Sequence, residues 1–277
     1  MKAINVKTEY MKNPVGIGAK NPRIMWNCDG GQKQTAYCID AVVDGKEWSS
    51  GKEESGSMHA DFGGALESRS AVRFKIRLWD ESGNEGEWSD ENTFEMGLLE
   101  KTDWQAKWIS GGYKVDKKKR YPVDCFKKEF DAKNVEKARL YITACGQYEA
   151  RLNGKKCGDF VLAPGAVDYR KRAQYQTYDV TSLLKEGGNA LTIELADGWY
   201  RGSSGSKGRV NTYGTQTKVI AQLEILTKNG VKTTICTDET WKWSNDGTIR
   251  FADLKDGETV DACLLYTSDA ADDLLCV

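Results

Sequence analysis

The sequence lacks the features that mark several large functional classes. Its 277 residues include a single histidine, and no stretch approaches the roughly 18–20 uninterrupted apolar residues that a membrane-spanning helix needs. Lys and Arg number 40 against 41 Asp and Glu, so the formal net charge is −1. A chain this close to neutral has no global field that attracts polyanions. We therefore expect neither a nucleic-acid partner nor a membrane partner.

Cysteine is present but forms no recognisable framework. No C-x-x-C pair occurs, and one histidine cannot complete a Cys/His zinc site. The N-terminal residues contain no apolar stretch of signal-peptide length. Reduced, mostly buried thiols in a cytoplasmic protein are the prediction. It concerns Cys28, Cys38, Cys125, Cys145, Cys157, Cys236, Cys263 and Cys276.

Local catalytic motifs are also missing. His59 lies in a loop-like segment without a G-x-S-x-G nucleophile motif elsewhere, so we interpret it as a surface or capping residue. Gly16-Ile17-Gly18 lacks the third glycine of a dinucleotide fingerprint. A glycosidase carboxylate pair is defined by its separation in space rather than in sequence. No catalytic residue is therefore predicted.

The remaining pattern is typical of β-strands. Residues 72–79 alternate Val72, Phe74, Ile76 and Leu78 with charged residues, as a half-buried strand requires. Similar alternation occurs at 37–43, 138–144, 148–152, 219–225 and 231–235. Asp-Gly and Asn-Gly pairs between these segments predict hairpins at 44–45, 153–154 and 229–230, since both central residues tolerate positive φ. Helical signal is confined to a turn at 179–185, so we predict an all-β protein of two consecutive β-sandwich domains.

The alternation is interrupted after residue 97 and resumes at Cys125. A boundary between domains is therefore predicted near residue 97. The intervening segment contains the charged run Lys117–Arg120, which we interpret as a solvated loop.

One aromatic segment suggests a binding site. Residues 196–202 follow an apolar strand and place Asp197, Trp199, Tyr200 and Arg201 beside glycines. Aromatic faces suit the apolar faces of sugars, while Asp and Arg suit their hydroxyl groups. These four residues are the predicted carbohydrate-binding residues. The alternative is structural: Trp199 closes the end of the sandwich and Arg201 pairs locally.

An ordered set of motifs carries a family resemblance. The motifs are LNG (152–154), GD (158–159), LAPG (162–165), DYRKRAQYQTYDVT (168–181), GGN (187–189) and DGWYRG (197–202). Together they resemble the N-terminal β-sandwich domain of bacterial α-L-rhamnosidases, glycoside hydrolase family 78. Segments at 13–17, 21–26, 77–80 and 87–89 resemble the fibronectin type III-like domain that precedes it.

This resemblance implies four segments. They are a fibronectin type III-like sandwich at 1–97, a connector at 98–124, a jelly-roll-like, carbohydrate-binding-module-like sandwich at 125–262, and a tail at 263–277. The tail departs from the family pattern, and we expect it to be non-native or disordered. It resembles translated sequencing-adapter sequence joined to a truncated gene, which implies that the natural protein continues past Ala262.

The resemblance also implies a function. Family members cleave terminal α-L-rhamnosyl residues from glycosides, with inversion and without an organic cofactor. Their catalytic carboxylates lie on an (α/α)6 barrel that this chain lacks. We therefore expect a non-catalytic fragment whose partners are a rhamnose-containing glycoside and the missing barrel. Exposed barrel-facing surface predicts poor solubility or self-association.

Two other functions stay open. The first is a stand-alone rhamnose-binding module, because some family members bind rhamnose through calcium in the equivalent sandwich. Calcium prefers oxygen ligands, and the candidates here are Asn153, Asp159, Asp168 and Asp197. The second is a fibronectin-like protein-interaction adaptor.

Overall fold

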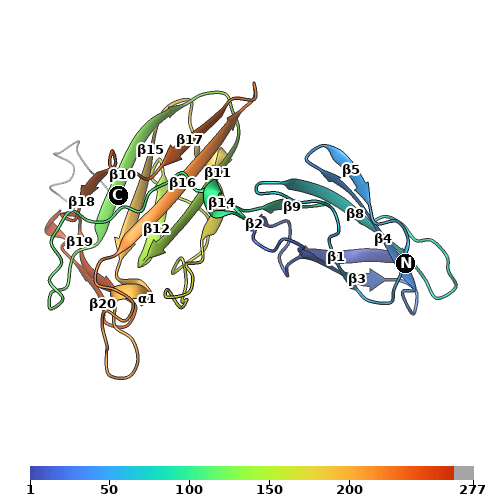
Figure 1. Ribbon diagram of the computed structural model, residues 1–277, viewed down its shortest axis with the longest axis horizontal. Coiled ribbons are helices and arrows are strands. Elements are labelled where there is room, and N and C mark those ends of the chain that lie inside the picture. Colours follow the sequence, from blue (N-terminus) through green and yellow to red (C-terminus); the bar gives the residue numbers. More distant parts are fainter. Residues whose placement is uncertain (265–277) are drawn as a thin grey trace. The chain divides into compact units, whose positions relative to one another are not determined.

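The computed structural model describes residues 1–264 and divides into two compact units. Unit 1 comprises Met1–Trp104, and unit 2 begins at Gln105 (Figure 1). No helix within residues 1–264 has the length and apolar character to cross a membrane. The predicted boundaries at 97, 124 and 262 stay predictions.

Unit 1 consists of two sheets. Strands β1 (Lys2–Thr8), β3 (Arg23–Asp29) and β7 (His59–Asp61) form an antiparallel sheet in the order β1-β3-β7. The second sheet has the order β2-β9-β8-β4-β5, with β6 also paired to β4. Its strands are β2 (Val15–Ile17), β4 (Ala36–Val43), β5 (Lys46–Ser49), β6 (Glu53–Glu54), β8 (Ala71–Trp79) and β9 (Asn92–Met96).

Both sheets of unit 1 contribute to one apolar core. Trp26 comes from the three-stranded sheet, Phe74 and Phe94 come from the larger one, and Phe62 follows β7. The ring of Phe62 meets that of Phe94 edge-on at 5.4 Å between centroids, a favourable aromatic geometry. A shared core between two sheets is the arrangement of a β-sandwich.

Unit 2 has two larger sheets and a separate hairpin. One sheet has the order β13-β12-β15-β10-β18, and the other has the order β14-β11-β16-β17. Their bounds are β10 (Asp124–Ala132), β11 (Val135–Cys145), β12 (Gln147–Leu152), β13 (Lys155–Lys156), β14 (Gln176–Asp179), β15 (Gly187–Ala196), β16 (Lys218–Thr227), β17 (Lys232–Cys236) and β18 (Lys242–Ser244). The hairpin pairs β19 (Ile249–Asp253) with β20 (Gly257–Val260).

The core of unit 2 is formed by the inward residues of both sheets. Leu140 and Ile142 on β11 pack in the same cluster as Ile193 and Leu195 on β15, and all four are fully buried. Helical structure within residues 1–264 is limited to the 3-10 turns η1 (Lys101–Asp103) and η2 (Thr181–Leu183), the one-turn helix α1 (Gly198–Arg201) and the two residues Cys263 and Leu264. The predicted all-β fold of two sandwiches is confirmed.

The hairpin turns differ in detail from the prediction. At Asp44-Gly45 and Asn153-Gly154 both residues have positive φ, as a two-residue turn with primed geometry requires. At 229–230 only Gly230 has positive φ, and its N–H donates to the carbonyl oxygen of Thr227. The expectation of two left-handed residues is therefore wrong there, since the loop is longer and needs only one.

The seven cysteines among residues 1–264 are free thiols. Cys125, Cys145 and Cys157 are buried, Cys263 is exposed, and the other three are partly buried. "Mostly buried" therefore describes only some of them. Cys276 lies outside the described residues, as does the predicted tail apart from Cys263 and Leu264.

Candidate functional site

The predicted sugar-binding residues lie on helix α1 and the residue before it, at the end of β15. Gly198 has a φ of +51°, and a Cβ built there would lie 2.7 Å from the backbone N of Gln147. A side chain at this position would therefore be strained and would collide with the neighbouring strand. The glycine lets the chain turn sharply off the sheet, so that Asp197 and Arg201 come together one helical turn apart.

Asp197 and Arg201 form a buried ion pair. Arg201 donates from Nε to Asp197 Oδ1 at 2.6 Å, and its Nη2 lies 2.6 Å from the same oxygen. The residues are 3% and 5% exposed. Burial raises the pKa of Asp197, against the opposing effect of the Arg201 and Arg120 guanidinium groups. Burial alone would lower the pKa of Arg201, but Asp197 and the Tyr113 hydroxyl raise it.

The pair continues into a second buried carboxylate. Arg201 donates through Nη1 to the Tyr113 hydroxyl at 2.9 Å, and that hydroxyl donates to Asp124 Oδ2 at 3.2 Å. Asp124 also accepts from Trp243 Nε1 at 3.1 Å and from the Thr217 hydroxyl at 3.2 Å. Burial raises the pKa of Asp124, and these donors oppose that effect. These three contacts satisfy its oxygens, as a buried carboxylate requires.

Arg120 binds the hairpin β19–β20 to this network. Its Nη2 lies 2.7 Å from Asp256 Oδ2, and its Nη1 lies 3.4 Å from Asp253 Oδ2 and 3.8 Å from Asp197 Oδ2. Its Nη2 also donates to the Ser203 hydroxyl at 3.0 Å. Residues 117–120 form the exposed loop that was predicted, and the prediction did not include the ion pairs of Arg120. Sequence spacing gave no signal of this, because its acidic partners lie 77 or more positions away.

Trp199 and Tyr200 occupy the outer side of the same helix. Trp199 is 36% exposed. Tyr200 meets the ring of Tyr169 edge-on at 5.2 Å, and Tyr169 meets Tyr213 at 5.3 Å. The Tyr200 ring packs directly over Gly214, where a Cβ would collide with it. The structure thus separates the four predicted residues into a buried ionic pair and an outward aromatic pair.

The calcium candidates do not gather at one place. Asn153 follows the Leu152 end of β12 and Asp197 follows β15 opposite the other end, which places them about 20 Å apart at about 3.3 Å per residue. Asp168 pairs with Arg170 at 2.8 Å, while Asp159 is exposed. No cluster of three or more His, Cys, Asp or Glu side chains suited to a metal occurs within residues 1–264. These four residues do not fit one calcium site, and calcium binding stays a prediction.

A carboxylate pair lies on the outer face of the five-stranded sheet. Glu149 and Glu194 are directly opposed across β12 and β15. Burial, followed by the charge of Glu149, raises the pKa of Glu194. Glu149 forms ion pairs with Arg151 and with Lys156, whose Nζ lies 3.0 Å from Glu149 Oε2.

The single histidine, His59, lies in unit 1, where it is exposed on β7.

Two family models match the chain in succession. One is described as "Rha78A-like, N-terminal immunoglobulin domain" and matches residues 3–100. The other is described as "Alpha-L-rhamnosidase N-terminal domain" and matches residues 133–270. The matches place both sandwiches within known domain families.

Curated relatives and solved structures agree with these matches. An α-L-rhamnosidase of Formosa agariphila is 35% identical over 96% of this chain and 31% of its own length. One of Streptomyces avermitilis is 49% identical over 47% of this chain and 12% of its own length. The crystal structure of native α-L-rhamnosidase from Aspergillus terreus superposes with a TM-score of 0.88 and 34% identity, covering 95% of this chain and 31% of that one. The chain thus spans a little under a third of the first relative and of this structure.

These matches identify the chain in terms of class and family. The two sandwiches correspond to the N-terminal domains of α-L-rhamnosidases. The chain belongs to the α-L-rhamnosidase family and corresponds to the N-terminal part of its members.

Proposed function

We propose that the complete protein hydrolyses terminal α-L-rhamnosyl residues of glycosides, and that this chain alone is inactive. The relatives extend over about three times its length. The family resemblance implies a catalytic (α/α)6 barrel, and the proposal assigns it to the part of the relatives that this chain does not match. Within residues 1–264, the buried carboxylates of unit 2 are engaged by arginine, tyrosine, tryptophan and threonine side chains.

The proposed role of unit 2 is to support the barrel and to line the path of its substrate with the outer side of α1. One observation carries this role: the polar groups of Asp197 and Arg201 are used internally, while Trp199 on the same turn is left exposed. A buried ion pair fixes the backbone of the turn, and the exposed indole is then a rigid apolar surface. Such a surface suits the C–H face of a deoxysugar such as rhamnose.

Hydrolysis of p-nitrophenyl α-L-rhamnopyranoside by the purified 277-residue chain tests the first part. We expect no release of nitrophenol, with the full-length Formosa agariphila relative as the active control. Turnover by the chain itself would overturn the assignment of catalysis to the missing portion.

A stand-alone rhamnose-binding module is the second candidate, and the exposure of Trp199 beside the tyrosines Tyr169, Tyr200 and Tyr213 favours it. Calorimetric titration of the chain with L-rhamnose distinguishes a binding module from a scaffold for the barrel. Binding that Trp199→Ala abolishes and Trp108→Ala preserves supports a module, whereas no heat supports a scaffold. The same titration with calcium and then with EDTA tests the cofactor, and a loss of binding in EDTA is the result that a calcium-dependent module requires.

A cytoplasmic location is part of the proposal. It is supported by seven free cysteines within the described residues, since thiols persist in reducing compartments.

A further inference from the structure

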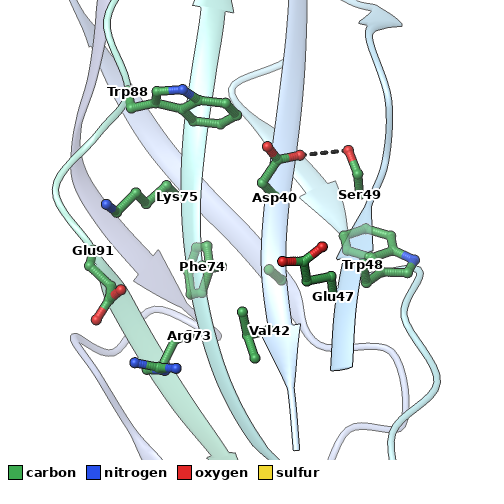
Figure 2. Close-up of a pocket in the computed structure, with 11 residues that line it drawn as sticks. Asp40, Val42, Glu47, Trp48, Ser49, Arg73, Phe74, Lys75, Trp88 and Glu91 are labelled. Carbon is green, nitrogen blue, oxygen red and sulfur yellow. Dashed lines mark hydrogen bonds between the residues drawn. The ribbon is translucent and has the colours of Figure 1, made fainter. Parts of the chain in front are cut away.

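The outer face of the larger sheet in unit 1 contains a hollow of about 700 Å³ (Figure 2). Outward side chains of β4, β5 and β8 form its floor, and Trp88, from the segment before β9, stands at one side. The volume falls within the range of about 300–1,000 Å³ that is typical of small-molecule sites. It is larger than a single sugar needs and suits a short oligosaccharide.

One tryptophan, Trp88, borders the hollow. The Arg77 guanidinium lies over the Trp88 ring, 4.3 Å from its centroid. Trp48 also contributes to the lining, but it pairs in register with the buried Ala41, so its ring points to the core and packs on Phe62 at 4.6 Å between centroids. The Trp88 indole is partly buried, so it presents a fixed apolar surface to the hollow. Rigid aromatic rings lose little conformational entropy when a ligand packs on them.

Hydrogen-bond donors and acceptors line the hollow beside the Trp88 ring. Asp40 faces Lys75 across β4 and β8, and it faces Ser49 across β4 and β5. The Ser49 hydroxyl donates to Asp40 Oδ1 at 2.5 Å, which fixes the carboxylate (Figure 2). Lys75 and its neighbour Arg73 make no ion pair or hydrogen bond through their side chains with any residue from 1 to 264. Their donors are therefore available to a ligand.

The charges in the hollow nearly cancel. The carboxylates of Asp40, Glu47 and Glu91 face the cations of Arg73 and Lys75. A nearly balanced lining does not favour a phosphate or a strongly acidic ligand. Sugar hydroxyls, in contrast, both donate and accept, so they can use carboxylates and ammonium groups side by side.

We propose that this hollow binds a neutral oligosaccharide of two or three units, with a sugar ring against Trp88 and its hydroxyls on Asp40 and Lys75. The binding site lies entirely in unit 1. It is separate from the surface around Trp199 in unit 2, and neither proposal depends on the other.

Isothermal titration of the 277-residue chain with rutinose, and with maltotriose as a second neutral probe, tests this site. We expect millimolar binding of at least one probe and at least tenfold weaker binding by Trp88→Ala, which corresponds to about 1.4 kcal/mol. Lys75→Ala, at an exposed position that the fold does not need, should also weaken binding about threefold or more.

Trp108→Ala is the matched control. Trp108 also has a cation over its ring, Lys218 Nζ at 5.2 Å, but it is exposed and lies in unit 2. The Trp108→Ala chain should bind both sugars as tightly as the parent chain does. The proposal is overturned if neither sugar binds, if Trp88→Ala and Lys75→Ala both bind normally, or if Trp199→Ala removes the binding instead.

Discussion

Asn153 donates from Nδ2 to the Oδ1 of Asn189 at 2.8 Å and so joins two hairpin ends that are 36 residues apart. Asn189 is 4% exposed, and its amide also donates to the carbonyls of Lys185 and Gly187. Asn153 in turn accepts from the N–H of Ala190. The LNG and GGN motifs are thus two halves of one hydrogen-bonded structure.

Asn189→Ala should lower the free energy of unfolding of unit 2 by about 2–4 kcal/mol, because the partly buried backbone groups of Lys185 and Gly187 and the Asn153 amide lose their partner. Urea unfolding followed by tryptophan fluorescence measures the change. Asn245→Ala is the control, since its side-chain amide makes no hydrogen bond to residues within the described range. Equal midpoints for the two variants would contradict the structural role of Asn189.

Arg201→Ala should lower the free energy of unfolding by about 3–5 kcal/mol, because it leaves the Asp197 carboxylate buried without its main partner. The double variant Asp197→Ala/Arg201→Ala should recover part of this lost stability. Arg209→Ala, at an exposed position, is the control and should change stability by less than about 0.5 kcal/mol. If Arg201→Ala is as mild as this control, the buried pair does not hold α1 in place.

The lowered pKa of Asp253 predicts that the protein loses stability in acid. Burial would raise its pKa, but the N–H groups of Asp256, Ser203 and Lys255, together with Arg120, lower it below 3.8. Since the folded-state pKa lies below the unfolded value, the stabilisation is complete above about pH 4 and is lost as pH falls through the folded-state pKa. Asp253→Asn should therefore cost about 1–3 kcal/mol at pH 7 and progressively less towards pH 2.5. Denaturant unfolding at each pH measures this, and a difference that does not change with pH would refute it.

Cysteine reactivity should differ sharply between two positions. Burial raises the pKa of Cys157 to about 12, so almost none of it is thiolate at pH 8.5. Iodoacetamide should modify the exposed Cys263 and spare Cys157 in the native chain. In urea both should react, and peptide mass spectrometry distinguishes the two sites. Rapid native labelling of Cys157 would show that its part of the core opens readily.

The sequence predicted the strands better than the site. Alternation at residues 72–79 is a local signal that corresponds directly to β8, Ala71–Trp79. The helix α1 escaped prediction because a single turn between glycines has no periodicity to detect. Arg120 and Asp124 also escaped, because only the fold brings their partners together. The acidic partners of Arg120 are 77–136 positions away, and Thr217 and Trp243 are 93 and 119 positions from Asp124. For Asp197 and Arg201 the chemistry was anticipated, but whether they face solvent or each other depends on the turn at Gly198.

Strand β18 places Trp243 against Asp124 at the start of β10, so one edge of the five-stranded sheet is completed by residues near the end of unit 2. During synthesis, β10 would leave the ribosome more than a hundred residues before this neighbour. Until then its outer edge has unpaired backbone groups, which are a template for pairing with other chains. Ribosome-bound chains that stop short of Ser244 should therefore depend on chaperones far more than chains that extend beyond it.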